Sequence, residues 1–155
     1  MRLSEWRAKA PVRDIMSPKV TETIEPVLVA LGAERDPHAW VVWGDDAAVR
    51  YLIMALTPIG LAICHVRVNV PGEGPRVAGK LVRWSRVQVG ELDVEMGGGH
   101  RLVSVQVESS VIRGVDDAVD QVAEFIHAVF AGMEGRSMQA SDGPKVRASR
   151  ATSRT

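Results

Sequence analysis

The chain lacks what secreted, zinc-binding and membrane-spanning proteins need. Cys64 is the only cysteine, so no intramolecular disulfide, zinc ribbon or redox pair can form. The longest apolar run, Tyr51 to Cys64, is about 14 residues long and contains Thr57-Pro58, whereas a membrane-spanning helix needs about 18 to 20. Charges occupy residues 1–7, where a signal peptide needs an apolar stretch. We therefore expect a cytoplasmic protein that does not enter a membrane.

Net charge is also lacking, because the formal charge of the chain is zero. The charge is unevenly divided, however: the five bases from Arg136 onward are accompanied by one acid, Asp142. This Ser/Arg/Ala-rich tail has no apolar periodicity, so we predict that residues 136–155 are disordered. Five bases without interleaved aromatic residues make a weak footprint for nucleic acid, and we expect a solubilising tail.

The remaining composition is that of one globular domain. Hydrophobic residues make up 46% and charged residues 25% of the chain, as in average soluble proteins. A chain of 155 residues is long enough to bury most of its unfolded apolar surface around one core. We divide it into an N-terminal segment (1–16), a single α+β domain (17–135) and the basic tail (136–155).

The domain is predicted to begin with a helix. Ser17-Pro18 combines a good N-cap with the residue best tolerated at the first helical position. Apolar residues then recur at helical spacing as far as Leu31, and Gly32 can end the helix. Pro26 lies inside it and lacks the amide for its helical hydrogen bond, so we expect a kink there.

Three strands are predicted to follow as a meander. The β-forming stretches 39–43 and 49–56 are followed by a third after the turn Pro58-Ile59-Gly60. In the third strand, alternation places Cys64 on the core face and His65 on the solvent face.

Residues 76–88 admit two interpretations. As a strand the segment alternates poorly. As a helix that starts at Pro75, it places Arg76, Lys80 and Arg83 on one face and its apolar residues on another. We favour the helix, although valines and Gly79 are poor helix formers.

Beyond Gly90 the pattern predicts a hairpin. Apolar and acidic residues alternate from Glu91 to Met96, three glycines make the turn, and a second alternating strand runs from Val103 to Val107. The register that sets apolar residues against apolar residues pairs Met96 with Arg101, Val94 with Val103 and Leu92 with Val105.

The last element, 116–133, is predicted to be a helix. Its apolar stripe consists of Val115, Val119, Val122, Ile126, Val129, Phe130 and Met133. Acidic residues crowd its N-terminal end, where the helix dipole favours them.

The predicted fold class is α+β. A mostly antiparallel sheet of about five strands packs against N-terminal, middle and C-terminal helices, in the order α-β-β-β-α-β-β-α. The alternative makes residues 76–88 a strand and gives a pleckstrin-homology-like barrel with a C-terminal capping helix.

The order of elements resembles that of type III secretion chaperone-like domains, including the YbjN family of bacterial sensory transduction regulators. The segment from Leu81 to Val94 is similar to that family's middle helix running through a glycine into a strand, and the closing hairpin and helix are similar too. The resemblance spans roughly residues 19–135. It implies a small, often dimeric, non-enzymatic module that binds protein segments.

Motifs that suggest chemistry have simpler interpretations. Gly74 to Lys80 matches the phosphate-binding pattern GxxxxGK, but Leu81 has no hydroxyl for Mg²⁺ and Pro75 removes a backbone amide. Val12 to Pro18 resembles the opening of a CBS domain, yet the pattern does not continue, and a helix cap explains it.

The titratable side chains also suggest no catalytic site. Cys64 and His65 point to opposite faces of one strand, so they cannot converge on a metal ion or act as nucleophile and base. The carboxylates of Glu91, Asp93 and Glu95 form one face of a strand, which is most often solvated. We predict no catalytic, cofactor-binding or metal-binding residues and no cofactor.

These observations predict a non-enzymatic protein-interaction or chaperone-like regulatory module that forms a homodimer. The partner is expected to be a protein or peptide segment rather than nucleic acid. The predicted partner-binding residues are Trp84, Arg76, Lys80 and Arg83, because an exposed tryptophan beside bases suits a partner surface. The alternative is a small-molecule or lipid-binding domain, which a deep apolar pocket would favour.

Overall fold

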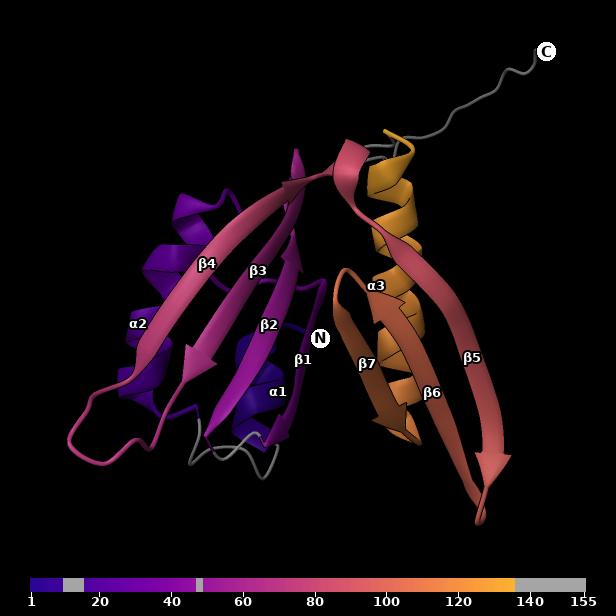
Figure 1. Cartoon of the computed structure of the whole chain (residues 1–155), viewed down its shortest axis with the longest axis horizontal. Coiled ribbons are helices and arrows are strands. Elements are labelled where there is room, and N and C mark those ends of the chain that lie inside the picture. The colour runs from indigo at the N-terminus through magenta and orange to yellow at the C-terminus, as the bar shows by residue number, and fades with distance from the viewer. Residues whose placement is uncertain (10–15, 47–48, 136–155) are drawn as a thin grey trace.

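Strands hold more residues than helices in the computed structural model, which describes residues 1–9, 16–46 and 49–135 (Figure 1). The predicted disordered tail, 136–155, lies outside the described residues. In chain order the elements are α1 (Leu3–Lys9), α2 (Pro18–Ala30), β1 (Trp40–Asp46), β2 (Arg50–Leu56), β3 (Gly60–Arg67), β4 (Arg76–Arg83), the short 3-10 helix η1 (Trp84–Arg86), β5 (Val89–Gly97), β6 (His100–Val107), β7 (Ser110–Val115) and α3 (Asp117–Met133).

The strands form two antiparallel sheets, which confirms the α+β class. One sheet has the order β1-β2-β3-β4 and the other β5-β6-β7. Figure 1 shows α1 and α2 on one side of the four-stranded sheet and α3 on the other, beside the three-stranded sheet. None of the described helices is long and apolar enough to cross a membrane.

The four-stranded sheet is buried on both faces along β2 and much of β3. On one face, Ile53 and Cys64 pack in a cluster with Ile24 and Leu28 of α2. On the other face, residues such as Met54 pack in a second cluster with α3 and the three-stranded sheet. Burial on both faces explains why β2 is a continuous apolar run instead of an alternating one.

The middle helix predicted for residues 76–88 is wrong. Residues 76–83 form β4, which pairs with β3 from Gly60 opposite Arg83 to Arg67 opposite Arg76. Gly79 lies so close to α2 that a Cβ there would be 2.4 Å from Val27 Cγ1. Gly79 therefore allows α2 to pack closely against the strand. The low helix propensity of glycine and valine does not destabilise this segment, because it is not a helix.

Two further features of the predicted architecture need correction. Residues 110–115 form β7, which was not predicted, so with β4 the described chain has seven strands and not about five. The alternative architecture correctly makes β4 a strand and places a helix at the C-terminal end. The two sheets are nevertheless separately hydrogen-bonded open sheets and not one closed barrel.

The locally encoded elements are confirmed. The Val20 amide donates to Ser17 Oγ at 3.3 Å, so Ser17 caps α2, and Pro18 opens the helix. The β5–β6 register is the predicted one, with Leu92 opposite Val105, Val94 opposite Val103 and Met96 opposite Arg101. The predicted C-terminal helix is α3.

Candidate functional site

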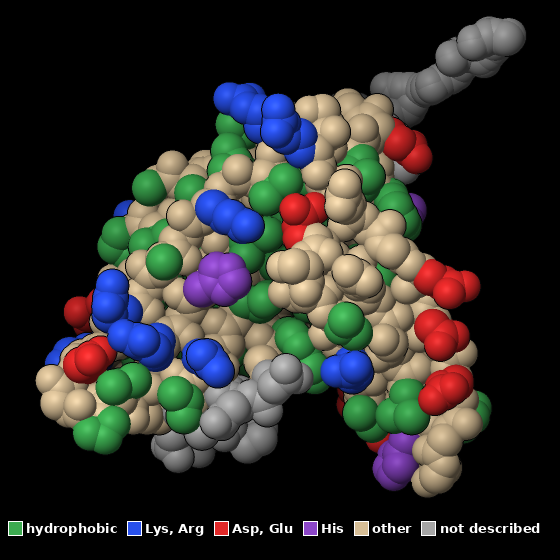
Figure 2. Space-filling view, viewed as in Figure 1, with side chains coloured by type: hydrophobic (Ala, Val, Ile, Leu, Met, Phe, Trp, Pro, Cys, Tyr) green, Lys and Arg blue, Asp and Glu red, His purple; other side chains and the backbone are tan. Residues whose placement is uncertain are grey.

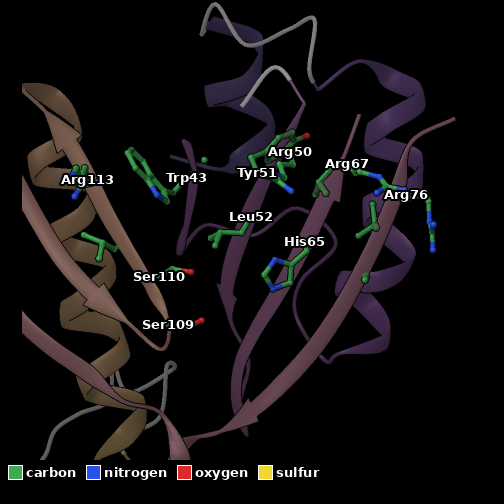
Figure 3. Close-up of a pocket in the computed structure, with 15 residues that line it drawn as sticks. Trp43, Arg50, Tyr51, Leu52, His65, Arg67, Arg76, Ser109, Ser110 and Arg113 are labelled. Atoms are coloured by element: carbon green, nitrogen blue, oxygen red, sulfur yellow. The ribbon is translucent and has the colours of Figure 1, made fainter. Parts of the chain in front are cut away.

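A cleft of about 830 Å³ opens between the two sheets. Its first wall is the end of the four-stranded sheet where β2 begins, β3 ends and β4 begins. Its second wall is β7 together with the residue before it. Figure 3 shows His65 and Leu52 on the first wall, with Ser109 and Ser110 on the second.

Three arginines form a row across the first wall. The ladder sets Arg50 of β2 opposite Arg67 of β3, and Arg67 opposite Arg76 of β4. Residues opposite each other on neighbouring antiparallel strands lie on the same face, with Cα atoms about 4.5 to 5.5 Å apart. The register therefore gathers three positive charges on the cleft face of the sheet.

A fourth arginine faces this row from the second wall. The Arg113 guanidinium of β7 lies 5.9 Å from the ring centroid of Trp43 in β1, which is a cation–π contact between the two sheets. The labelled side chains in Figure 3 show Arg113 and Trp43 turned toward one another. The Trp43 ring also gives the cleft an apolar surface beside the charge.

The positive charge of the cleft is only partly neutralised. Arg67 pairs with Glu73 at 3.2 Å, and both side chains are about half exposed. Among the residues whose side chains the structure describes, which leave out residues 45 and 46, Arg50 and Arg76 make no ion pair. No acidic residue lines the cleft among those whose side chains are described.

Figure 2 shows how the charges are separated on this face of the molecule. Lysine and arginine side chains and a histidine lie over the four-stranded sheet, whereas acidic side chains lie along the edge formed by β5. This face of the described chain therefore carries a positive region over the four-stranded sheet and a negative region along β5.

The four predicted partner-binding residues do not lie together on one face. Arg76 and Lys80 are exposed on the cleft face of β4, and Arg76 lines the cleft. Arg83 lies an odd number of residues away, so its side chain points to the other face of the strand. Trp84 is half-buried and packs against the core at Gly132 of α3.

Sequence reasoning missed Arg50, Arg67 and Arg113 as site residues. The signal that was available is the polar face of β3, on which His65 and Arg67 alternate with buried residues. The row itself could not be found, because it depends on β4 being a strand paired to β3.

Cys64 is buried on the opposite face of β3, as predicted. Burial raises the pKa of its thiol to about 11, so it is protonated at neutral pH and is a poor nucleophile. Within the described ranges, no three His, Cys, Asp or Glu side chains are grouped in a way that could hold a metal ion.

A second cavity, of about 710 Å³, lies between α1, β1 and α3. Trp6 and Trp40 line it, with ring centroids 5.0 Å apart. Three acidic residues of α3 also line it, namely Asp117, Asp120 and Glu124. This cavity therefore differs in charge from the cleft between the sheets.

In comparisons with known proteins, no family model, no curated protein and no solved structure matches the chain.

Proposed function

We propose that the protein is a non-enzymatic binding domain that takes an anionic small molecule into the cleft between its sheets. The observation that carries this proposal is the row Arg50, Arg67 and Arg76 facing Arg113, which brings four positive charges to one cleft. The size of the cleft lies in the range of small-molecule sites, about 300 to 1,000 Å³.

Physical chemistry supports an anion as the occupant. Like charges directly opposite each other on neighbouring strands destabilise a sheet, so the row costs free energy that a bound anion would offset. Guanidinium groups bind phosphate and carboxylate through paired hydrogen bonds, which makes arginine well suited to such ligands. The Trp43 ring and the Leu52 side chain beside the row suit an apolar or aromatic portion of the ligand.

Of the two classes of partner expected from the sequence, this proposal follows the small molecule. The resemblance to secretion chaperone-like domains included a middle helix, and that segment is β4 and η1. The resemblance therefore lends less support to a protein segment as the ligand of the cleft. The homodimer, the cytoplasmic location and the absence of enzymatic activity stay predictions.

The test is thermal unfolding of the full chain with a panel of anions at low ionic strength. The panel contains inorganic phosphate, pyrophosphate, citrate and adenosine monophosphate, each compared with sodium chloride of equal ionic strength. A ligand at a hundred times its dissociation constant stabilises the native state by about 2.7 kcal/mol, so we expect a rise of several degrees in Tm.

The variants Arg50→Gln and Arg113→Gln are expected to lose most of this stabilisation. Arg83→Gln is the matched control, because Arg83 is exposed on the opposite face of β4 and does not line the cleft. The proposal is wrong if no anion stabilises the protein beyond its chloride control. It is equally wrong if Arg83→Gln abolishes the effect as fully as Arg50→Gln does.

A further inference from the structure

The strand β5 leaves an apolar face open to solvent. Leu92, Val94 and Met96 are 40%, 52% and 70% exposed. Leu92 and Val94 pair in register with Val105 and Val103, which are buried beneath α3. The apolar face of β5 is therefore a continuation of the core face of its sheet.

This face is open because α3 does not cover it. The helix packs against β7 and β6, and β5 lies beyond β6 at the edge of the sheet. Figure 1 shows β5 along the outer margin of the molecule, with no described element on its far side. Three large apolar side chains on an open edge strand are typical of a surface that binds another chain.

The backbone of β5 is also available for pairing. Gly98 and Gly99 have φ values of +59° and +82°, which are those of a two-residue hairpin turn. The flanking pair, Gly97 and His100, is hydrogen-bonded in such a hairpin, and bonded pairs alternate with non-bonded pairs along the ladder. The amides and carbonyls of Met96, Val94 and Leu92 therefore point away from β6, toward the open edge.

The opposite face of β5 is acidic. Glu91, Asp93 and Glu95 are exposed, and none of them makes an ion pair with another part of the described chain. Figure 2 shows acidic side chains along the edge that β5 forms. A strand added to β5 would have side chains on both faces of the sheet. On one face they would lie beside the three apolar residues of β5, and on the other beside its three carboxylates.

This pattern disfavours a second copy of β5 as the added strand. When two β5 strands pair antiparallel about a two-fold axis, residues of the same face lie opposite each other. Carboxylates would then oppose carboxylates along the whole pair, which destabilises it. The acidic face thus disfavours pairing of β5 with a second copy of itself. A strand that carries positive charge can still pair with this edge.

We propose that β5 docks an extended segment of another protein in which lysine or arginine alternates with apolar residues. The segment adds a fourth strand to the β5-β6-β7 sheet. Its backbone pairs with Leu92, Val94 and Met96, its apolar side chains cover theirs, and its bases face Glu91, Asp93 and Glu95. This docking surface is separate from the cleft between the sheets, and the inference does not depend on the ligand proposed there.

The test measures binding of a fluorescein-labelled octapeptide in which lysine alternates with threonine and valine. Fluorescence anisotropy with the full chain gives the affinity, and amide chemical shifts locate the peptide. We expect saturable binding that weakens with added salt, with the largest shifts at Leu92, Val94 and Met96. A peptide with glutamate in place of lysine is expected not to bind.

Two variants separate the backbone contribution from the charge. Val94→Pro removes an amide that points to the open edge and is not needed for the β6 ladder, so the fold is retained and affinity falls about tenfold or more. The triple variant Glu91→Lys, Asp93→Lys, Glu95→Lys is expected to reverse the preference, so that the glutamate peptide binds and the lysine peptide does not.

Val115→Lys is the matched control, since Val115 is an apolar residue of similar exposure, 50%, on the other edge strand, β7. Affinity should stay within about twofold of the parent chain. Unchanged lysine-peptide affinity in Val94→Pro and in the triple variant would overturn the proposal. So would a dimer in sedimentation that Val94→Pro dissociates, because the occupant would then be a second copy.

The basic residues 136–155 of the chain are the remaining alternative occupant. A chain ending at Gly135 distinguishes them from a separate partner. Equal peptide affinity of the full and shortened chains supports the proposal. Binding that appears only in the shortened chain overturns it, because the protein's own C-terminal residues would then occupy the edge.

Discussion

The indole ring of Trp84 in η1 lies directly over Gly132 in α3. A Cβ at position 132 would come within 2.5 Å of Trp84 Cζ2 and 2.6 Å of Cε2. This contact fixes the end of α3 against the segment that joins the two sheets. The tryptophan predicted to be a partner-binding residue is thus part of the packing between helix and sheets.

We predict that Gly132→Ala lowers the stability of the protein. Alanine favours a helix over glycine by about 1 kcal/mol, but the rigid ring cannot move away without disturbing the core. Overpacking costs about 1 to 3 kcal/mol, so we expect a net loss of up to about 2 kcal/mol in urea unfolding. In a Trp84→Leu background the same change should cost less, since the smaller side chain leaves room. An equal cost in both backgrounds would show that the ring is not responsible.

Arg76→Gln should have opposite effects on stability and on ligand binding. In the absence of ligand, the variant relieves repulsion with Arg67 and is expected to gain about 0.2 to 1 kcal/mol in free energy of unfolding. With the anion that stabilises the parent chain, the variant should gain less in Tm. Urea and thermal unfolding measure the two effects, and Arg83→Gln should show neither. Lower stability of Arg76→Gln without ligand would assign the arginine a structural role instead.

The ionisation of Cys64 predicts an alkaline loss of stability. Burial raises the pKa of the folded thiol from 9.0 to about 11. The unfolded chain therefore loses this proton first as pH rises, and stability present below pH 9 is lost progressively toward pH 11. The loss amounts to at most about 3 kcal/mol. Urea unfolding between pH 8 and 11 should show a shallower decline for Cys64→Ala than for the parent chain.

Tyr51 also contributes to the loss of stability at alkaline pH, both in the parent chain and in Cys64→Ala. Burial raises the pKa of its phenol as well, so its share of the alkaline loss remains after Cys64 is replaced. The comparison between the parent and Cys64→Ala isolates the thiol for this reason. Identical pH profiles for the two chains would mean that the thiol ionises equally in the folded and unfolded states.

The sequence by itself determined the elements that depend on neighbouring residues. The Ser17 cap, the three-strand meander, the β5–β6 register and α3 follow from local side-chain patterns, and all are confirmed. The cap, the hairpin and α3 depend on residues close in the sequence, and the meander strands are apolar runs bounded by turn residues, so the local pattern reports each structure directly.

Only the tertiary structure decided that residues 76–83 are a strand. One face of β4 meets α2, where Gly79 leaves a gap in the apolar pattern. Its other face is polar at Arg76, in the cleft, and apolar at Val82, which packs against the core. Alternation fails because the surroundings change along the strand, and those surroundings come from segments distant in the sequence. The arginine row depends on that pairing, so the cleft became visible only with the fold.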